Sequence, residues 1–205
     1  MRIVDVTRPV FSGMPVWPGD PPCRCGWSAR LPDDGVNAAE LSFGAHTGTH
    51  VDGPLHVLED GARIGDVPLA AFVGPAHVVD ADGGAEIEAE WLATHLPAGC
   101  ERLLLRTRAW ADPAIFPARW PALTPAAARL LVDRGVRLVG TDAPSPDPPD
   151  AADLPVHHVL LHAGVPIIEN LLLDHVPGGA YELIALPLRL IEADASPVRA
   201  VLVQR

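Results

Sequence analysis

The sequence predicts one α/β domain that spans residues 1–205. Short runs rich in valine, isoleucine and leucine alternate with segments that carry helix-capping residues, and no long linker separates them. Most of the short runs are apolar on successive residues, which is typical of strands that are covered on both faces. A length of 205 residues also suits one domain with a sizeable buried core.

Seven apolar runs are predicted as strands, because they are short, rich in β-branched residues and bounded by turn residues. In chain order they are Arg2–Val6, Ala39–Ala45, Ala76–Asp80, Arg102–Arg106, Arg137–Gly140, Tyr181–Leu186 and Val198–Val203.

The clearest helix is predicted over Thr124–Gly135 from the residues at its two ends. Thr124 can accept a hydrogen bond as the N-cap, and Pro125 fits the first helical position, where no amide donor is needed. Gly135 favours the end of the helix because glycine adopts the left-handed conformation found there.

A second helix is predicted over Asp153–Gly164, where Asp153 precedes Leu154-Pro155 and Gly164 is the stop signal. A weaker helix is predicted over Glu86–His95. The stretch Pro144–Pro149 is predicted as a loop, because proline removes amide donors and fixes φ.

The composition argues against a nucleic-acid partner, a membrane span and export. The formal net charge is -11 and the chain contains no lysine, so we expect no nucleic-acid partner. No stretch approaches the roughly 20 apolar residues that span a bilayer, and an acid at Asp5 interrupts the N-terminus before any signal-like apolar run. Three cysteines without C-x-x-C spacing (Cys23, Cys25, Cys100) favour free thiols and a cytoplasmic location.

Three histidines and an aspartate fall within eleven residues, His46-Thr-Gly-Thr-His50-Val-Asp52-Gly-Pro-Leu-His56. The small residues and Gly53-Pro54 disfavour a helix, so the segment is predicted as the end of a strand that turns into a loop, with Ala39–Ala45 leading in. In extended chain His50 and Asp52 project from the same face, and the intervening glycine permits a turn that brings His46 beside them. Imidazole nitrogen and carboxylate oxygen suit zinc or a similar divalent cation. The spacing by itself indicates a metal site or a general base, and no more.

This segment resembles the signature of the metal-dependent cyclase family, whose members include bacterial kynurenine formamidases. The resemblance continues along nearly the whole chain. The further matching segments are Trp17-Pro-Gly-Asp20, Val139-Gly-Thr-Asp-Ala-Pro-Ser145, His157-His158, Ile167-Ile-Glu-Asn-Leu171, Tyr181-Glu-Leu-Ile-Ala-Leu-Pro187 and Ala195-Ser-Pro-Val-Arg-Ala-Val201.

The resemblance implies a swivelling three-layer β/β/α fold, a homodimer and a site for two Zn²⁺ ions. The same ligands would also accept Mn²⁺. It implies that His46, His50 and Asp52 hold the first metal and that Asp52 bridges to the second. His157 would bind the second metal and Glu169 both. His56 would be a general acid/base rather than a ligand, and Trp17 would line the substrate pocket, from its own subunit or from the neighbouring one.

The residues themselves leave some of these assignments open. Adjacent residues on a helix diverge by about 100°, so His157 and His158 are not expected to face one site, and only the resemblance favours His157. Glu169 follows the apolar run Val165–Ile168, which suggests a buried strand that ends in a carboxylate. A turn acid is an equal alternative for Glu169, and simple packing is an alternative for Trp17. Asp142 is interpreted as a turn former or a support of the site, and His77, His95, His162 and His175 as structural.

The chemistry fits an amide hydrolase, because bound zinc lowers the pKa of water from 15.7 to about 7 and an anilide nitrogen must be protonated to leave. The first hypothesis is hydrolysis of N-formyl-L-kynurenine to L-kynurenine and formate, a step in tryptophan breakdown. The second is hydrolysis of another small amide or a cyclic amide such as isatin. The third is a non-catalytic metal-binding protein, which would have no use for the unligated His56.

Overall fold

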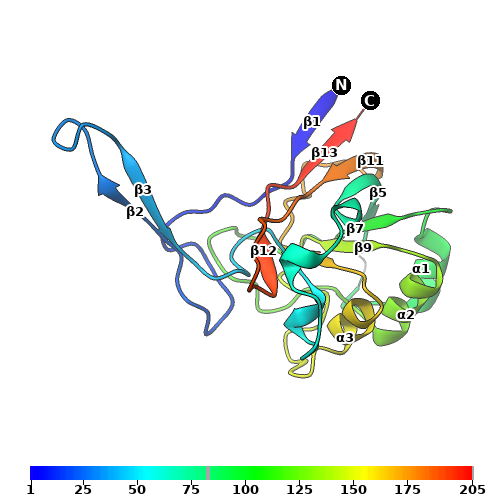
Figure 1. Ribbon diagram of the computed structural model, residues 1–205. Coiled ribbons are helices and arrows are strands. Elements are labelled where there is room, and N and C mark those ends of the chain that lie inside the picture. The colour runs from blue at the N-terminus through cyan, green and yellow to red at the C-terminus, as the bar shows by residue number, and fades with distance from the viewer. Residues whose placement is uncertain (82–83, 205) are drawn as a thin grey trace.

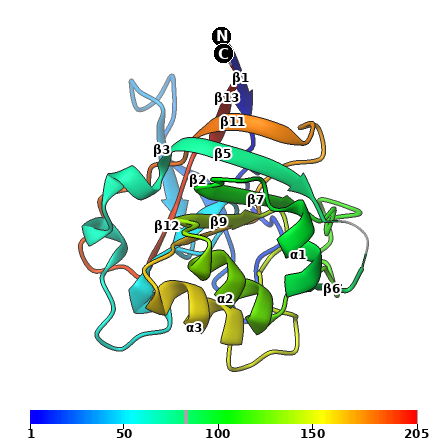
Figure 2. The same cartoon turned by 90° about the vertical axis from the view of Figure 1, so that its right-hand side faces the viewer.

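The computed structural model describes residues 1–81 and 84–204 and contains a nine-stranded mixed sheet with three helices on one side (Figures 1 and 2). The strands follow the spatial order β1 (Arg2–Asp5), β13 (Val201–Gln204), β11 (Gly179–Ile184), β5 (Val73–Asp80), β7 (Arg102–Arg106), β9 (Leu138–Thr141), β10 (Ile167–Glu169), β4 (His50–Asp52) and β12 (Ala195–Pro197). The central strands β5, β7, β9 and β10 run parallel, and the flanking pairs are antiparallel. The predicted α/β class is therefore confirmed.

The shorter elements complete the chain. The helices are α1 (Ala89–His95), α2 (Pro125–Asp133) and α3 (Pro155–His162), with 3-10 turns at Pro54–His56, Ile64–Asp66 and Leu69–Ala71. Two further strand pairs lie outside the large sheet: β2 (Arg24–Ala29) with β3 (Ala38–Ser42), and β6 (Glu86–Ile87) with β8 (Ala122–Leu123). The first and last strands pair with each other, so the termini lie side by side (Figure 1).

The central strands are covered on both faces, as their continuous apolar sequences predict. In β7, Leu103 and Leu105 pack into a core shared with the helices, whereas Leu104 packs into the core on the opposite face. All three leucines are at most 1% exposed. Burial of a leucine side chain stabilises a fold by about 1.5–3 kcal/mol, so these strands anchor the sheet.

The predicted end residues of α2 are confirmed. Thr124 Oγ1 accepts a hydrogen bond from Ala127 N at 3.2 Å as the N-cap, and Gly135, after the helix, has φ +75°. The prediction over Glu86–His95 is wrong at its start, because Glu86–Ile87 pairs with β8 before α1 begins. Pro144–Pro149 contains neither helix nor strand, as predicted.

The predicted cap of α3 is also wrong. Leu154 precedes the helix with φ +44° and provides no side-chain bond, and Asp153 is exposed and does not cap. Asp147, from the predicted loop, instead accepts hydrogen bonds from Val156 N (2.8 Å) and His157 N (3.0 Å). An anion at these free amides is favourable, which accounts for the substitute cap.

The predicted strand Ala39–Ala45 is confirmed over Ala39–Ser42, but it is wrong in its end and in leading directly into the histidine segment. Residues Ala38–Ser42 form β3, which pairs with β2 in a hairpin that projects from the body (Figure 1). Most side chains of β3 are exposed, and a turn over residues 43–49 separates it from β4. The error arose because β2 carries arginine, glycine and serine, so its sequence gave no sign of a partner strand. The predicted run Val198–Val203 likewise contributes only its end to β13 and follows the separate strand β12.

Candidate metal centre and cavity

The pairing of β4 with β10 brings His50 and Glu169 together. The two strands are antiparallel, with Glu169 opposite His50 and Ile167 opposite Asp52. Alternation along β4 points His50 and Asp52 to one face, while Val51 packs into the core on the other face. His50 Nε2 lies 3.3 Å from Glu169 Oε2 and 3.4 Å from Asp52 Oδ1.

The orientation of His50 is fixed by the turn before it. Its Nδ1 lies 2.9 Å from Gly48 O, which leaves Nε2 to face the two carboxylates. Gly48 has φ +67°, a conformation that L side chains rarely adopt, so glycine is needed in this turn. The expected role of the glycine in bringing the histidines together is confirmed.

The helix α3 supplies His157 from the other side of the cluster. His157 Nε2 lies 3.2 Å from Glu169 Oε1 and 3.5 Å from Asp52 Oδ2. Its Nδ1 lies 2.7 Å from Asp147 Oδ2, so one buried carboxylate both caps the helix and orients the imidazole. His158 is exposed, as the helical geometry predicts for a neighbour on another face.

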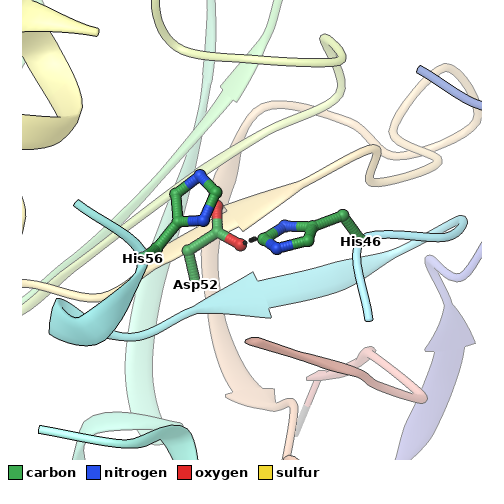
Figure 3. A group of neighbouring side chains, drawn as sticks. All are labelled: His46, Asp52 and His56. Carbon is green, nitrogen blue, oxygen red and sulfur yellow. Dashed lines mark ion pairs between the residues drawn. The ribbon is translucent and has the colours of Figure 1, made fainter. Parts of the chain in front are cut away.

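A third carboxylate, Asp194, lies between His46 and His56 at the outer edge of the cluster. Asp194 Oδ2 is 2.9 Å from both His46 Nε2 and His56 Nδ1. The other nitrogen of His46, Nδ1, is 2.9 Å from Asp52 Oδ1 (Figure 3). The 3-10 turn that follows Gly53-Pro54 places His56 above Asp52.

Charge in this cluster stabilises protonated imidazoles. Burial opposes protonation of His46, but its contacts with Asp194 and Asp52 outweigh burial and raise the His46 pKa to about 10. The pKa values of His50 and His157 are raised in the same way by nearby carboxylates, and the pKa of Asp52 falls well below its ordinary value despite burial. The centre is thus a buried site that attracts positive charge.

The donor set fits a divalent metal. His50 Nε2, both oxygens of Asp52 and Glu169 Oε1 are buried, and their contacts of 2.9–3.5 Å within the cluster are ion pairs that lack hydrogen-bond geometry, so among residues 1–81 and 84–204 none of these atoms has a hydrogen-bond partner. Buried polar atoms are rarely left unpaired, and imidazole nitrogen with carboxylate oxygen is a typical ligand set for zinc and similar cations. Two groups are close enough to hold an ion, and both include Asp52: one adds His50 and Glu169, the other His46 and His56.

The cluster opens on a cavity of about 740 Å³. His46, His50, His56, His157 and Glu169 all line this cavity. Its far wall is aromatic: Trp17 contacts Phe116 edge-to-face at 5.6 Å, and Phe116 contacts Trp110 at the same centroid distance. The cavity therefore combines a polar, metal-binding floor with a wall that suits a flat ring.

Comparison with known proteins agrees with this geometry. Residues 4–148 match the model of the cyclase family, described as "Putative cyclase". The chain belongs to the cyclase family. A kynurenine formamidase of Salinibacter ruber is 46% identical, with 98% of this chain and 97% of the relative aligned.

Solved structures of cyclase-family proteins have the same fold as this chain. A predicted metal-dependent hydrolase from Bacillus stearothermophilus superposes with a TM-score of 0.84 at 33% identity and covers 98% of this chain and 97% of its own. Isatin hydrolase A from Labrenzia aggregata gives a TM-score of 0.87 at 29% identity, with 100% and 94% covered. The expected family fold is confirmed.

Every residue proposed for the site of this cyclase-family chain belongs to the cluster or lines the cavity above it. His46, His50, Asp52, His157 and Glu169 form the cluster, His56 lies against it, and Trp17 lines the cavity. The four histidines expected to be structural do not line this cavity. Asp142 accepts bonds from the backbone amides of Thr107 and Arg108 and stabilises that turn.

Sequence reasoning missed three residues that contact the site: Asp147, Asp194 and Arg8. Asp147 was placed in a loop without a role, although aspartate among prolines is a common capping arrangement. Asp194 and Arg8 belong to no spacing pattern, because they lie near opposite ends of the chain. Only the fold brings Asp194 to His46 and His56 and brings Arg8 to the cavity. The three cysteines are free thiols, as expected, and none of the described helices has the length and apolar character of a membrane span.

Proposed function

We propose that this chain is a metal-dependent formamidase that hydrolyses N-formyl-L-kynurenine to L-kynurenine and formate. The observation that carries the proposal is the cluster of imidazoles and buried carboxylate oxygens without hydrogen bonds at the floor of an aromatic cavity. The relatedness to kynurenine formamidases over the full chain supports the same substrate. We treat residues 1–205 as one hydrolase domain.

We assign His46, His50 and Asp52 to one metal and His157 to a second, with Asp52 and Glu169 shared. Zn²⁺ is the preferred ion and Mn²⁺ an acceptable one for these ligands. A bound divalent ion activates water as a nucleophile and polarises a carbonyl oxygen. The shared position of Asp52 in both candidate groups supports the assignment as a bridge.

His56 is assigned to proton transfer. Its Nδ1 contacts Asp194, so Nε2 is the nitrogen left to exchange a proton with substrate. In the reaction a water oxygen adds to the formyl carbon, the C–N bond breaks, and the anilide nitrogen leaves with a proton. Positioned acid–base help of this kind is typically worth 10²–10⁴-fold. Trp17 is assigned to contact the aryl ring of the substrate.

The assay follows loss of the formyl anilide by absorbance, with metal analysis of the same protein. Complete removal of metal by a chelator should abolish turnover, and added Zn²⁺ or Mn²⁺ should restore it. Turnover that survives full metal removal would refute the proposal. His56→Ala should lower the rate by at least 100-fold and keep the metal content. Equal loss of metal would instead make His56 a ligand, as its grouping with His46 and Asp52 allows.

A second candidate is hydrolysis of a cyclic amide such as isatin, and the structural likeness to isatin hydrolase A favours it. Competition between the two substrates in one assay separates the candidates. A metal-storage protein would bind the ion tightly and turn over neither substrate.

We also propose that the protein is a cytoplasmic homodimer. The projecting β2–β3 hairpin exposes Trp27 and Leu41, which are 52% and 60% accessible, and a second copy could cover them. Light scattering that gives a monomer at micromolar concentration would contradict the dimer.

A further inference from the structure

Arg8 is a buried cation in the wall of the cavity. The residue is 8% exposed and lines the same cavity as the histidine cluster. Within residues 1–81 and 84–204 its guanidinium has no ion pair and no hydrogen bond, and its Nε is fully buried without a partner. A buried charge is costly unless it is paired, so an unpaired guanidinium in a cavity indicates a missing anion.

The position of Arg8 is fixed from both sides. Its guanidinium carbon lies 3.9 Å from the centroid of the Trp110 ring, a cation–π contact that holds the group against the wall. Its backbone amide donates to Thr49 Oγ1 at 2.9 Å, and Thr49 Oγ1 donates to Asn170 O at 2.6 Å. Thr49 and Asn170 adjoin His50 and Glu169 in sequence, so these bonds hold the backbone of Arg8 beside the metal cluster, while its guanidinium lies against Trp110 in the wall of the same cavity.

Arg8 stays charged at neutral pH. Burial lowers its pKa to about 10, opposed by the more distant charges of Asp142 and Asp174. Among the described residues that line the cavity it is the only arginine, and the chain has no lysine. The planar fork of an arginine pairs best with a carboxylate, through two parallel hydrogen bonds.

We propose that Arg8 binds the α-carboxylate of the substrate while the formyl group lies at the metal cluster, so that this cavity selects anilides that carry an anionic side chain. The inference rests on the proposed function and deepens it. Arg8 would then be a specificity residue, because it would contact the α-carboxylate of the substrate and not the amide bond that breaks.

The test compares two matched substrates, N-formyl-L-kynurenine and its methyl ester, which keeps the ring and the ammonium group but lacks the anion. Arg8→Met removes the charge at similar length. We expect kcat/KM for the acid to fall by about 10- to 100-fold and that for the ester to change less than about threefold. Arg8→Lys should lie between wild type and Arg8→Met for the acid. Arg129→Met, on the exposed face of α2, is the control and should change neither substrate.

An equal loss on both substrates, or a fall in melting temperature that accounts for the loss, would overturn the proposal and make Arg8 a packing residue of Trp110. A direct binding measurement keeps the test independent of turnover: calorimetry of the metal-loaded protein with L-kynurenine and with its methyl ester. If neither formyl compound is hydrolysed but Arg8→Met still weakens binding of the acid alone, the formamidase proposal fails and the role of Arg8 stands. If hydrolysis is normal and the acid-to-ester ratio is unchanged by Arg8→Met, the role of Arg8 fails and the formamidase stands.

Discussion

Replacing Asp147 by asparagine should weaken metal binding, although Asp147 is not itself a proposed metal ligand. Asp147 is fully buried and accepts three hydrogen bonds, from Val156 N at 2.8 Å, His157 N at 3.0 Å and His157 Nδ1 at 2.7 Å. Asparagine keeps one oxygen and can adopt two orientations. If the oxygen accepts from Val156 N, the amide group faces both donors of His157, and the imidazole can accept from the amide only by moving its proton to Nε2, which then cannot bind a metal. If the oxygen faces His157, the amide group opposes Val156 N at the start of α3, and the imidazole loses the negative charge behind it.

The size of the effect follows from the number of bonds lost. Asparagine loses one or two of the three bonds, and a hydrogen bond to a buried charge contributes about 1.5–3 kcal/mol, so we expect the free energy of unfolding to fall by about 1.5–6 kcal/mol. Loss of a support behind a metal-binding histidine typically lowers metal affinity 10–100-fold. The assays are denaturant unfolding with a chelator present, and competition for Zn²⁺ against a chromophoric chelator.

The matched control is Asp153→Asn, an exposed acid six residues further along the same loop. It should leave the free energy of unfolding within about 0.5 kcal/mol of wild type, because it does not cap α3. If Asp147→Asn keeps wild-type zinc affinity while Asp153→Asn destabilises the protein, the cap and the support of His157 have been assigned to the wrong aspartate.

Two further changes test the surroundings of the site and the sheet. Asp194→Asn should lower kcat by about 10- to 100-fold, because the imidazole of His56 loses the anion at Nδ1. An unchanged kcat would show that Asp194 does not orient this imidazole. Asp80→Asn should destabilise the fold at pH 7 by no more than about 1 kcal/mol, because Asp80 pairs with Arg106 but is 43% exposed. The bond from Arg106 lowers the Asp80 pKa, so this contribution is present above the unfolded-state pKa of about 3.9 and is lost as pH falls through the folded value. Thermal unfolding at pH 7 and pH 3 should show the gap between wild type and Asp80→Asn closing in acid, and a constant gap would contradict the assignment.

The sequence predicted the central sheet well, because burial on both faces leaves a strong local pattern. The run Arg102–Arg106 coincides with β7, and the capping residues of α2 occupy their predicted positions. The strands that build the site were harder to predict. The elements β4, β10 and β12 have three residues each, too few for any period to appear. The strand β4 pairs with β10 and β12, which lie more than 100 residues away in sequence, and no local pattern records such pairing.

The candidate site divides in the same way between local and long-range information. His46, His50 and Asp52 share one short segment, so their spacing alone indicated a metal site or a general base. The choice between His157 and His158 required a family resemblance, because adjacent helical positions differ only in the direction they face. Arg8 and Asp194 gave no sequence signal. Each is recognisable only by its surroundings in the fold: a cation without an anion, and an anion shared by two imidazoles.

The charge around the centre favours the proposed pair of ions over a single ion. Asp52 and Glu169 lie at the middle, Asp147 lies behind His157, and Asp194 lies behind His46. Four carboxylates carry four negative charges, which two divalent ions balance and one ion leaves half compensated. In the absence of metal the same excess raises the pKa values of the buried histidines, because protons then supply the missing positive charge. Metal must displace those protons, so its affinity should fall as the pH is lowered. The outer carboxylates, Asp147 and Asp194, thus contribute to the charge balance of the centre as the proposed ligands do. A neutral substitution at Asp147 should therefore lower metal affinity, and one at Asp194 should lower kcat.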